Sequence, residues 1–147
     1  MNKKIKNTNP FNYDGIDFKS KLEKDAYILL KEADLNPSYE AYTFTVFNEF
    51  EAKVPFYKST KCYRFKARNS SIEPITYTPD FVIRYKETLA IIEIKGYPND
   101  VYPIKRKLFR ALLEGFKEPV RILFFEPKNI REVRKTIEII KDDTEES

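Results

Sequence analysis

One apolar stretch, residues 89–96, restricts the possible folds of this chain more than any other. It reads Leu-Ala-Ile-Ile-Glu-Ile-Lys-Gly, so Glu93 and Lys95 interrupt an otherwise aliphatic run. A short run of this kind is typical of a strand buried in a sheet. Burial removes water from a charged group, and the cost is high unless a partner compensates for it. The stretch therefore predicts a buried strand whose two charged residues have partners elsewhere in the chain.

A second strand-like stretch, residues 76–85, precedes the first across a short polar turn. The two stretches can pair as an antiparallel hairpin with Lys86 and Glu87 at its tip. This register sets Asp80 directly opposite Glu93, and opposed residues hold their Cβ atoms about 5 Å apart on the same face. The sequence thus predicts two carboxylates side by side at one end of the hairpin.

These carboxylates, together with Lys95, suggest a chemistry. Lys95 lies two residues after Glu93 and shares its face by the strand period of two. Neighbouring carboxylates repel each other, so one takes up a proton or both share a cation, and Mg²⁺ favours such oxygen ligands. Lys95 would then position or deprotonate a water, or neutralise charge on a phosphodiester. The alternative is an Asp that closes a turn after Pro79 and a Glu–Lys pair on a solvated edge strand.

Composition limits the kinds of site that the chain can build. None of the 147 residues is histidine, which excludes Ser-His-Asp and Cys-His catalysis, His-dependent nucleases and Cys/His zinc sites. The single cysteine, Cys62, cannot form an internal disulfide and fits a reducing cytoplasm. No apolar run is long enough to span a membrane, so we expect no membrane partner. Catalysis, if present, depends on carboxylates, lysine, tyrosine and metal.

Length and charge predict one domain with polar ends. We expect a basic N-terminal arm over 1–17, a single domain over 18–141 and an acidic tail over 142–147. The net charge of +4 includes that tail, so the rest of the chain is more basic and attracts polyanions. Charge alone does not decide whether a protein binds nucleic acid.

The first helix and first strand are predicted from local patterns. Ser20 and Glu23 form a capping box before a helical apolar stripe, so a helix is expected from about Lys21 to Ala33. The simplest role of Glu23 is to cap this helix. An alternating stretch rich in β-branched and aromatic residues, 39–50, predicts the first core strand.

Residues 51–75 form a basic and aromatic insertion in the predicted domain. Six basic residues and no acidic one lie between positions 52 and 72: Lys53, Lys58, Lys61, Arg64, Lys66 and Arg68. Aromatic residues are interleaved with them, and a strand is expected over 62–67. This mixture suits backbone contacts and stacking on unpaired bases. A β-hairpin with inward aromatics and solvated lysines is equally consistent with the pattern.

A second helix is expected to begin at a cap, Asn99 or Asp100, and to end at Gly115. Its core-facing residues would be Ile104, Leu108, Ala111 and Leu112. Its basic residues would bind phosphates or form a solvated face: Lys105, Arg106, Lys107 and Arg110.

A short apolar strand over 119–125 and an amphipathic helix from about Asn129 complete the pattern. The predicted fold class is therefore α/β (α+β with a mixed sheet), in the order α-β-β-β-α-β with a C-terminal helix.

Two short motifs carry a resemblance. Pro79-Asp80 followed by Glu93-Ile94-Lys95 resembles the signature of the PD-(D/E)xK nuclease superfamily. The resemblance implies a restriction-endonuclease-like core in which Asp80, Glu93 and the Ile94 backbone carbonyl bind Mg²⁺ or Mn²⁺. It also implies that Lys95 assists catalysis.

A further match concerns Glu23. Ser20, Leu22 and Glu23, ahead of Tyr77 to Phe81, resemble phage endonuclease I-type Holliday junction resolvases, which implies that Glu23 is an additional metal-site carboxylate. The stretch from Glu93 into the second helix is also similar to short phage-encoded PD-(D/E)xK proteins. The insertion at 51–75 departs from this pattern and leaves the choice of substrate open.

The function expected from the sequence is a metal-dependent DNA endonuclease, with branched or junction DNA as the leading substrate. The alternative is a nucleic-acid-binding or phage assembly protein that retains the fold without chemistry. A homodimer would supply two sites for paired cuts, but no residue establishes the oligomeric state.

Overall fold

The computed structural model describes residues 9–59, 65–95, 100–118 and 121–142, and the side chains of 65–69 lie outside that description. The chain folds into two compact units. The first unit comprises residues 1–42, 78–98 and 116–147, and the second comprises 43–77 and 99–115. Each unit is described separately below.

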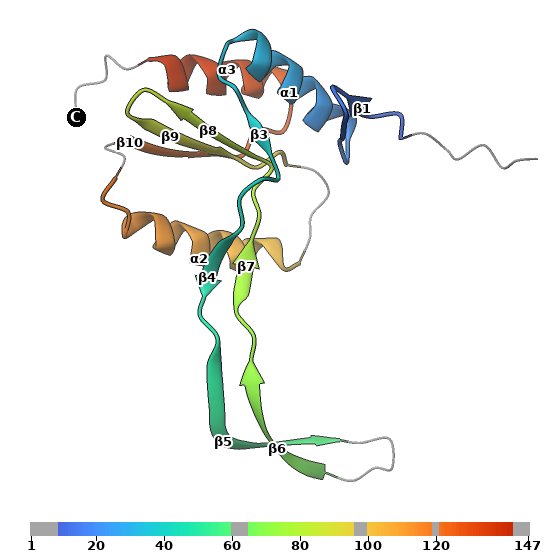
Figure 1. Cartoon of the computed structure of the whole chain (residues 1–147), viewed down its shortest axis with the longest axis vertical. Coiled ribbons are helices and arrows are strands. Elements are labelled where there is room, and N and C mark those ends of the chain that lie inside the picture. Colours follow the sequence, from blue (N-terminus) through green and yellow to red (C-terminus); the bar gives the residue numbers. More distant parts are fainter. Residues whose placement is uncertain (1–8, 60–64, 96–99, 119–120, 143–147) are drawn as a thin grey trace, which may run out of the picture. The chain divides into compact units, whose positions relative to one another are not determined.

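The first unit is built on a four-stranded mixed sheet (Figure 1). The strand order is β10-β9-β8-β3, in which only the β9–β10 pair is parallel. The strands are β3 (Ser38–Tyr39), β8 (Phe81–Tyr85), β9 (Thr88–Ile92) and β10 (Arg121–Phe125). Every residue of β9 is buried, as its aliphatic sequence predicts.

The predicted hairpin register is confirmed. Val82 pairs with Ile91 and Phe81 with Ile92. Lys86 occupies the turn with a φ of 51°, a left-handed conformation that tight hairpin turns require. Asp80 and Glu93 are the next positions along the two strands and therefore leave the sheet at the same end.

Two helices pack with this sheet in the first unit, α1 (Lys21–Glu32) and α3 (Ile130–Lys141) (Figure 1). The Ser20 and Asn129 side chains cap them, as the sequence predicts for Ser20. The core between the helices and the sheet is apolar and includes Phe18, Leu30, Ile83, Ile92, Val133 and Ile140. Each of these side chains contributes about 1.5–3 kcal/mol through burial.

Residues 9–17 differ from the arm expected over 1–17. They contain a short antiparallel ribbon, β1 (Asn12–Tyr13) and β2 (Ile16–Asp17), joined at Asp14 and Gly15. Both turn residues have positive φ, 55° and 74°. Asp-Gly between short strands is a hairpin signal, and the prediction of an arm did not take it into account. Lys3, Lys4 and Lys6 lie outside the described residues.

Gly15→Ala should lower the free energy of unfolding by about 1 kcal/mol, because Ala is strained at positive φ. A Cβ at Gly15 meets no atom within 4 Å, so the backbone conformation is the whole cost. For a chain of this size we expect Tm to fall by about 3 °C. Gly115→Ala is the matched control, because its φ of −86° suits any residue. Equal Tm changes in both variants would contradict the assignment of strain to Gly15.

The described part of the second unit contains two antiparallel strand pairs and one helix. The pairs are β4 (Phe44–Phe47) with β7 (Ile75–Tyr77), and β5 (Phe50–Ser59) with β6 (Phe65–Ile72). The helix is α2 (Tyr102–Glu114). The ring of Phe109 on α2 lies 5.1 Å from that of Phe44 and 4.8 Å from that of Tyr77. These three rings form the aromatic core of this unit.

The prediction of one core strand over 39–50 is wrong. The stretch contains β3, β4 and the start of β5, and only β3 belongs to the four-stranded sheet. Glu40 has a φ of 47°, so the chain turns away from the sheet directly after Tyr39. Alternation cannot report such a turn because the residues beyond it are again strand-like. Of the strand expected over 62–67, residues 65–67 lie in β6 and the others fall outside the described residues.

The ends and the buried face of α2 differ in part from the prediction. Its N-cap is Val101, which makes no side-chain capping bond, and Pro103 lies in the first turn. Gly115 is the C-cap, as expected. The fully buried residue is Phe109, whereas Ile104 is 60% exposed and Ala111 is also exposed. The aromatic contacts of Phe109 determine which face of α2 is buried, and the aliphatic pattern alone did not indicate this face.

The predicted class is confirmed. Over the described residues the fold is α+β, with one mixed sheet, antiparallel strand pairs and three helices, and α3 is the last described element. Among the described residues, none of the helices has the length and apolar character needed to cross a membrane.

Candidate functional site

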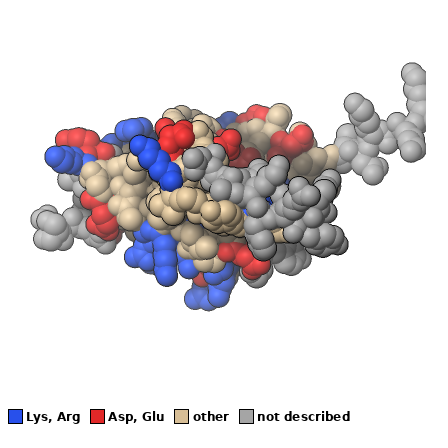
Figure 2. Space-filling view, turned by 90° about the horizontal axis from the view of Figure 1, so that it is seen from below, with Lys and Arg blue, Asp and Glu red and all other residues tan. Residues whose placement is uncertain are grey.

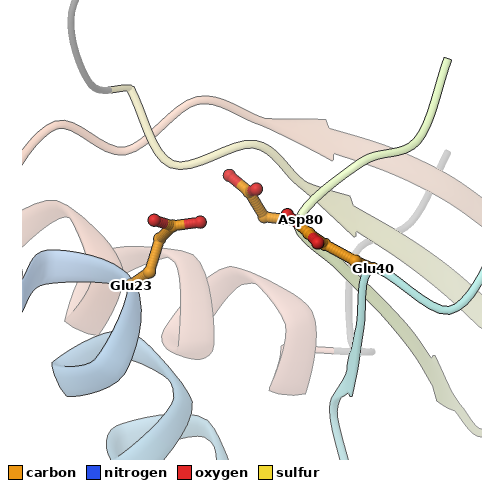
Figure 3. A group of neighbouring side chains, drawn as sticks. All are labelled: Glu23, Glu40 and Asp80. Carbon is orange, nitrogen blue, oxygen red and sulfur yellow. The ribbon is translucent and has the colours of Figure 1, made fainter. Parts of the chain in front are cut away.

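Three carboxylates of the first unit converge at one point (Figure 3). Glu23 is in the first turn of α1, Glu40 follows β3, and Asp80 precedes β8. One oxygen from each lies within 4.8 Å of the other two. The backbone N–H of Glu40 donates a hydrogen bond to the Asp80 carbonyl oxygen at 2.9 Å, which holds these two residues side by side.

Glu23 both caps its helix and faces the other carboxylates. Its backbone N–H donates to Ser20 Oγ at 3.1 Å, which confirms the capping box. The buried carboxylate accepts hydrogen bonds from Ser20 Oγ at 3.0 Å and from Tyr39 Oη at 3.1 Å. The cap and the site are therefore compatible roles, because one side chain serves both.

Asp80 is the most deeply buried carboxylate of the group, with 2% of its surface exposed. Its Oδ2 accepts a hydrogen bond from the Ile94 backbone N–H at 2.8 Å. Its Oδ1 is also buried and accepts no hydrogen bond. A buried oxygen with a free lone pair is costly unless a cation lies nearby. The cation near Oδ1 is the Lys19 ammonium group, whose Nζ lies 3.4 Å away.

The pKa values follow from this crowding. Burial, reinforced by the charge of Glu93, raises the pKa of Asp80 to about 7, although Lys19 and the Ile94 N–H oppose the shift. Burial and the charge of Asp80 raise the pKa of Glu23. The half-buried Glu93 thus acts on Asp80 from the adjacent strand, as the predicted register requires. A cation bound here would reverse these shifts.

Lys19 provides positive charge at this group. Its Nζ lies 2.8 Å from Glu40 Oε1, 3.4 Å from Asp80 Oδ1 and 3.8 Å from Glu23 Oε1. Burial lowers the pKa of Lys19, but the hydrogen bond to Glu40 and the nearby carboxylates raise it above its ordinary value. The contact with Asp80 is an ion pair by distance but lacks the geometry of a hydrogen bond.

Glu40 and Lys19 were not selected by sequence reasoning. Both come to the site through the tertiary fold, and the sequence pattern only includes Glu40 in the strand-like stretch 39–50. A weak signal exists for Lys19, since a cation just before a helix N-terminus is unfavourable unless acids compensate. For Glu40 the sequence contains no such signal.

The remaining predicted metal-site residues lie in the same unit. The Lys95 side chain is exposed, and its backbone N–H donates to the Pro127 carbonyl oxygen at 3.0 Å. Ile94 contributes its N–H to Asp80, while a role for its carbonyl oxygen stays a prediction. Lys19 is the lysine with its ammonium group at the three carboxylates, and a role for Lys95 stays a prediction.

The predicted nucleic-acid-binding residues belong to the second unit. Four are on α2: Lys105, Arg106, Lys107 and Arg110. Arg106 lies over the Tyr102 ring at 5.7 Å. Lys61 and Arg64 are outside the described residues, and Lys66 and Arg68 are placed by their backbone in β6. On the face drawn in Figure 2, described basic side chains stand among acidic and uncharged ones.

The donor set fits a hard divalent cation. Carboxylate oxygens from Glu23, Glu40 and Asp80 are the ligands that Mg²⁺ and Mn²⁺ prefer, and Glu93 adds negative charge from the adjacent strand. The Oδ1 of Asp80 accepts no hydrogen bond and is therefore available to bind an ion.

The fold and site define a mixed α+β protein with an acidic centre in which Glu23 and Asp80 are buried and Glu40 is exposed. Residues 3–125 match the model of DUF1064, a family described as a protein of unknown function, and the chain belongs to this family. The match includes all the carboxylates discussed above. No curated protein and no solved structure matches the chain.

Proposed function

We propose that the protein is a divalent-metal-dependent endodeoxyribonuclease. The observation that carries the proposal is the buried Asp80, whose Oδ1 accepts no hydrogen bond and lies beside Glu23 and Glu40. The strand register supports it, because Asp80 and Glu93 are brought to one end of the hairpin as the PD-(D/E)xK resemblance requires.

Each residue has a separate role in this proposal. Glu23, Glu40, Asp80 and Glu93 would hold Mg²⁺ or Mn²⁺, which when bound supplies a Lewis acid and lowers the pKa of water. The Ile94 N–H fixes Asp80, and Lys19 offsets part of the negative charge of the carboxylates until they bind the ion. Lys95, with its exposed ammonium group, would neutralise charge on the phosphodiester as it is attacked.

DNA is the proposed substrate and the cytoplasm the proposed compartment, the latter because a single cysteine suits a reducing environment. Branched or junction DNA is the leading substrate, because the Ser20–Glu23 motif resembles that of junction-resolving phage enzymes.

The direct test is cleavage of labelled duplex, single-stranded, flap and four-way-junction DNA with Mg²⁺, Mn²⁺ or EDTA. We expect cutting with either metal ion and none with EDTA. The preferred substrate would identify the role of the enzyme. Cleavage that persists in EDTA, or no cleavage of any substrate with either ion, would overturn the proposal.

Metal binding should also stabilise the fold. At a concentration 100 times its Kd, an ion that binds only the native state adds about 2.7 kcal/mol to the free energy of unfolding. For a chain of this size, we expect Mn²⁺ to raise Tm by about 5–10 °C at pH 8. The rise should be smaller at pH 5, where protons compete for Asp80, whose pKa is raised to about 7. Differential scanning fluorimetry measures both values.

Asp80→Asn is the control for this measurement, because it removes a charged ligand and keeps the side-chain shape. Its Tm should be unaffected by the metal ion. An equal rise of Tm in the variant and in the wild type would show that the ion binds elsewhere.

The alternative is a binding protein that retains the fold without chemistry. One observation favours it: Lys19 already contacts all three carboxylates, so part of their negative charge is compensated without metal. Under this alternative, metal changes neither Tm nor DNA integrity.

A further inference from the structure

The β5–β6 hairpin of the second unit presents unusually exposed aromatic residues. Phe56 is 63% exposed and Tyr57 is 62% exposed, and Val54 beside them is 81% exposed. Large aromatic side chains usually contribute their area to a core or an interface. A two-stranded hairpin is at best marginally stable alone, so exposed rings on such a ribbon indicate a binding surface.

The register assigns different chemistry to the two faces of the ribbon. Phe56 pairs with Arg68, and Lys58 pairs with Lys66. Because opposite positions share a face and alternate positions return to it, these four positions form one face, which we call the Phe56 face. It combines one aromatic position with three cationic ones.

The other face has no charged position in the same segment. Tyr57 pairs with Ala67, and Ser59 pairs with Phe65. Tyr57 is therefore an internal reference: it is adjacent to Phe56 and equally exposed, but it belongs to the uncharged face.

The charge of the segment indicates the partner. No acidic residue occurs between positions 52 and 72, whereas six basic residues do. The three cationic positions of the Phe56 face would repel the same face of a second copy. A polyanion with aromatic groups is complementary both to the cationic positions and to the aromatic ring of this face. Single-stranded nucleic acid is such a polymer, since its phosphates pair with cations and its unpaired bases stack on rings.

We propose that the Phe56 face binds a single-stranded segment of DNA, with Phe56 stacked on a base and Lys58 at a phosphate. The inference rests on the proposed function and specifies that the DNA substrate contains an unpaired strand. A two-stranded ribbon also fits the major groove of a duplex. The bases of a duplex are stacked on each other, however, so a freely exposed ring has a stacking partner only in an unpaired strand.

The test is fluorescence anisotropy of labelled oligothymidylate and of a duplex of equal length, measured in EDTA with the full chain. We expect the single strand to bind more tightly than the duplex. Phe56→Ala should weaken binding of the single strand about tenfold, because stacking on an aromatic ring contributes strongly for each base. Tyr57→Ala is the matched control and should change Kd by less than about twofold if Phe56 alone stacks. Circular dichroism checks that both variants fold.

Salt dependence tests the cationic positions separately. Loss of one phosphate contact to a single strand reduces the slope of log K against log salt by about 0.7. Lys58→Ala should show this reduction, whereas Phe56→Ala should weaken binding without changing the slope.

Three results would overturn the inference: tighter binding to the duplex, equal losses in the Phe56 and Tyr57 variants, or no binding of oligothymidylate. A change of oligomeric state in Phe56→Ala, seen by sedimentation, would instead assign the face to a second copy.

Because binding is measured in EDTA, it does not depend on cleavage. Binding without metal-dependent cutting would refute the proposed function alone, and cutting without Phe56-dependent binding would refute this inference alone.

Discussion

Asp80→Asn and Glu93→Gln should each reduce metal-dependent DNA cleavage by about 10²–10³-fold or more, the range seen when one charge-stabilising group is removed from an active site. Each change replaces a carboxylate by a neutral amide of nearly the same shape. Asp80 is expected to show the larger loss, because it is more deeply buried than Glu93 and contacts the Ile94 N–H. Single-turnover cleavage at saturating enzyme measures this loss without the contribution of product release.

Glu32→Gln is the matched control, because Glu32 is an exposed carboxylate on the same helix as Glu23. Its cleavage rate should equal that of the wild type. If Asp80→Asn also retains the wild-type rate, the acidic centre is not the catalytic site.

Glu40→Gln tests whether Glu40, which the structure places at the site, or Glu93, which the resemblance implies, is the more important metal ligand. The three converging carboxylates include Glu40, whereas the PD-(D/E)xK resemblance implies Glu93. A greater loss of metal affinity in Glu40→Gln than in Glu93→Gln would show that the three converging carboxylates hold the ion.

Lys19→Met and Lys95→Met distinguish the roles of the two lysines in the same cleavage assay. If Lys95 acts on the phosphodiester, only Lys95→Met lowers the rate at saturating metal.

Asp80→Asn should also make the protein more stable at pH 8, by up to about 4 kcal/mol in the absence of metal. The reason is the raised pKa of Asp80, about 7 in the folded protein against an ordinary value of 3.8. Burial and the charge of Glu93 disfavour the ionised form, and an amide at this position carries no charge to bury. The Asn oxygen can still accept the hydrogen bond from the Ile94 N–H.

The dependence on pH has a definite sign. Below about pH 4, Asp80 is protonated in both the folded and the unfolded chain, so it has no unfavourable effect. Between pH 4 and pH 7 the folded chain keeps the proton that the unfolded chain has lost. The free energy of unfolding of the wild type should therefore fall as pH rises through this window, and the Asp80 contribution should be constant above it.

Urea denaturation at pH 5, 6, 7 and 8 measures this slope in both proteins. The difference in stability between Asp80→Asn and the wild type should grow from pH 5 to pH 7 and then level off. Glu32→Gln again serves as control and should leave the slope unchanged. A difference that is independent of pH would show that Asp80 is ionised throughout, with Lys19 as its compensating charge.

Local patterns predicted several features of the fold correctly. The β8–β9 register could be read because the two strands are adjacent in sequence, joined by a short turn, and alternate with a fixed period of two. The α1 cap could be read because Ser20 and Glu23 bond within one helical turn. The ribbon at Asp14–Gly15 was equally local, and its turn signal was available in the sequence although it was not used.

The errors arose where distant segments meet or the backbone turns unexpectedly. The stretch 39–50 has strand chemistry throughout, but the positive φ of Glu40 divides it between the two units. On α2, Phe109 is buried because Phe44 and Tyr77, far away in the sequence, contribute the rings around it. Neither fact follows from residues near Glu40 or Phe109.

The sequence by itself determined that Asp80 and Glu93 lie at the same end of one hairpin, since strand pairing of neighbours is a local matter. Only the tertiary structure decided the rest of the centre. It brings Lys19 and Glu23 from the start of α1, and Glu40 from the end of β3, to Asp80, and it buries Asp80 so that its Oδ1 accepts no hydrogen bond. Burial and convergence depend on how helix, strand and turn pack together, and no spacing along one segment encodes that packing.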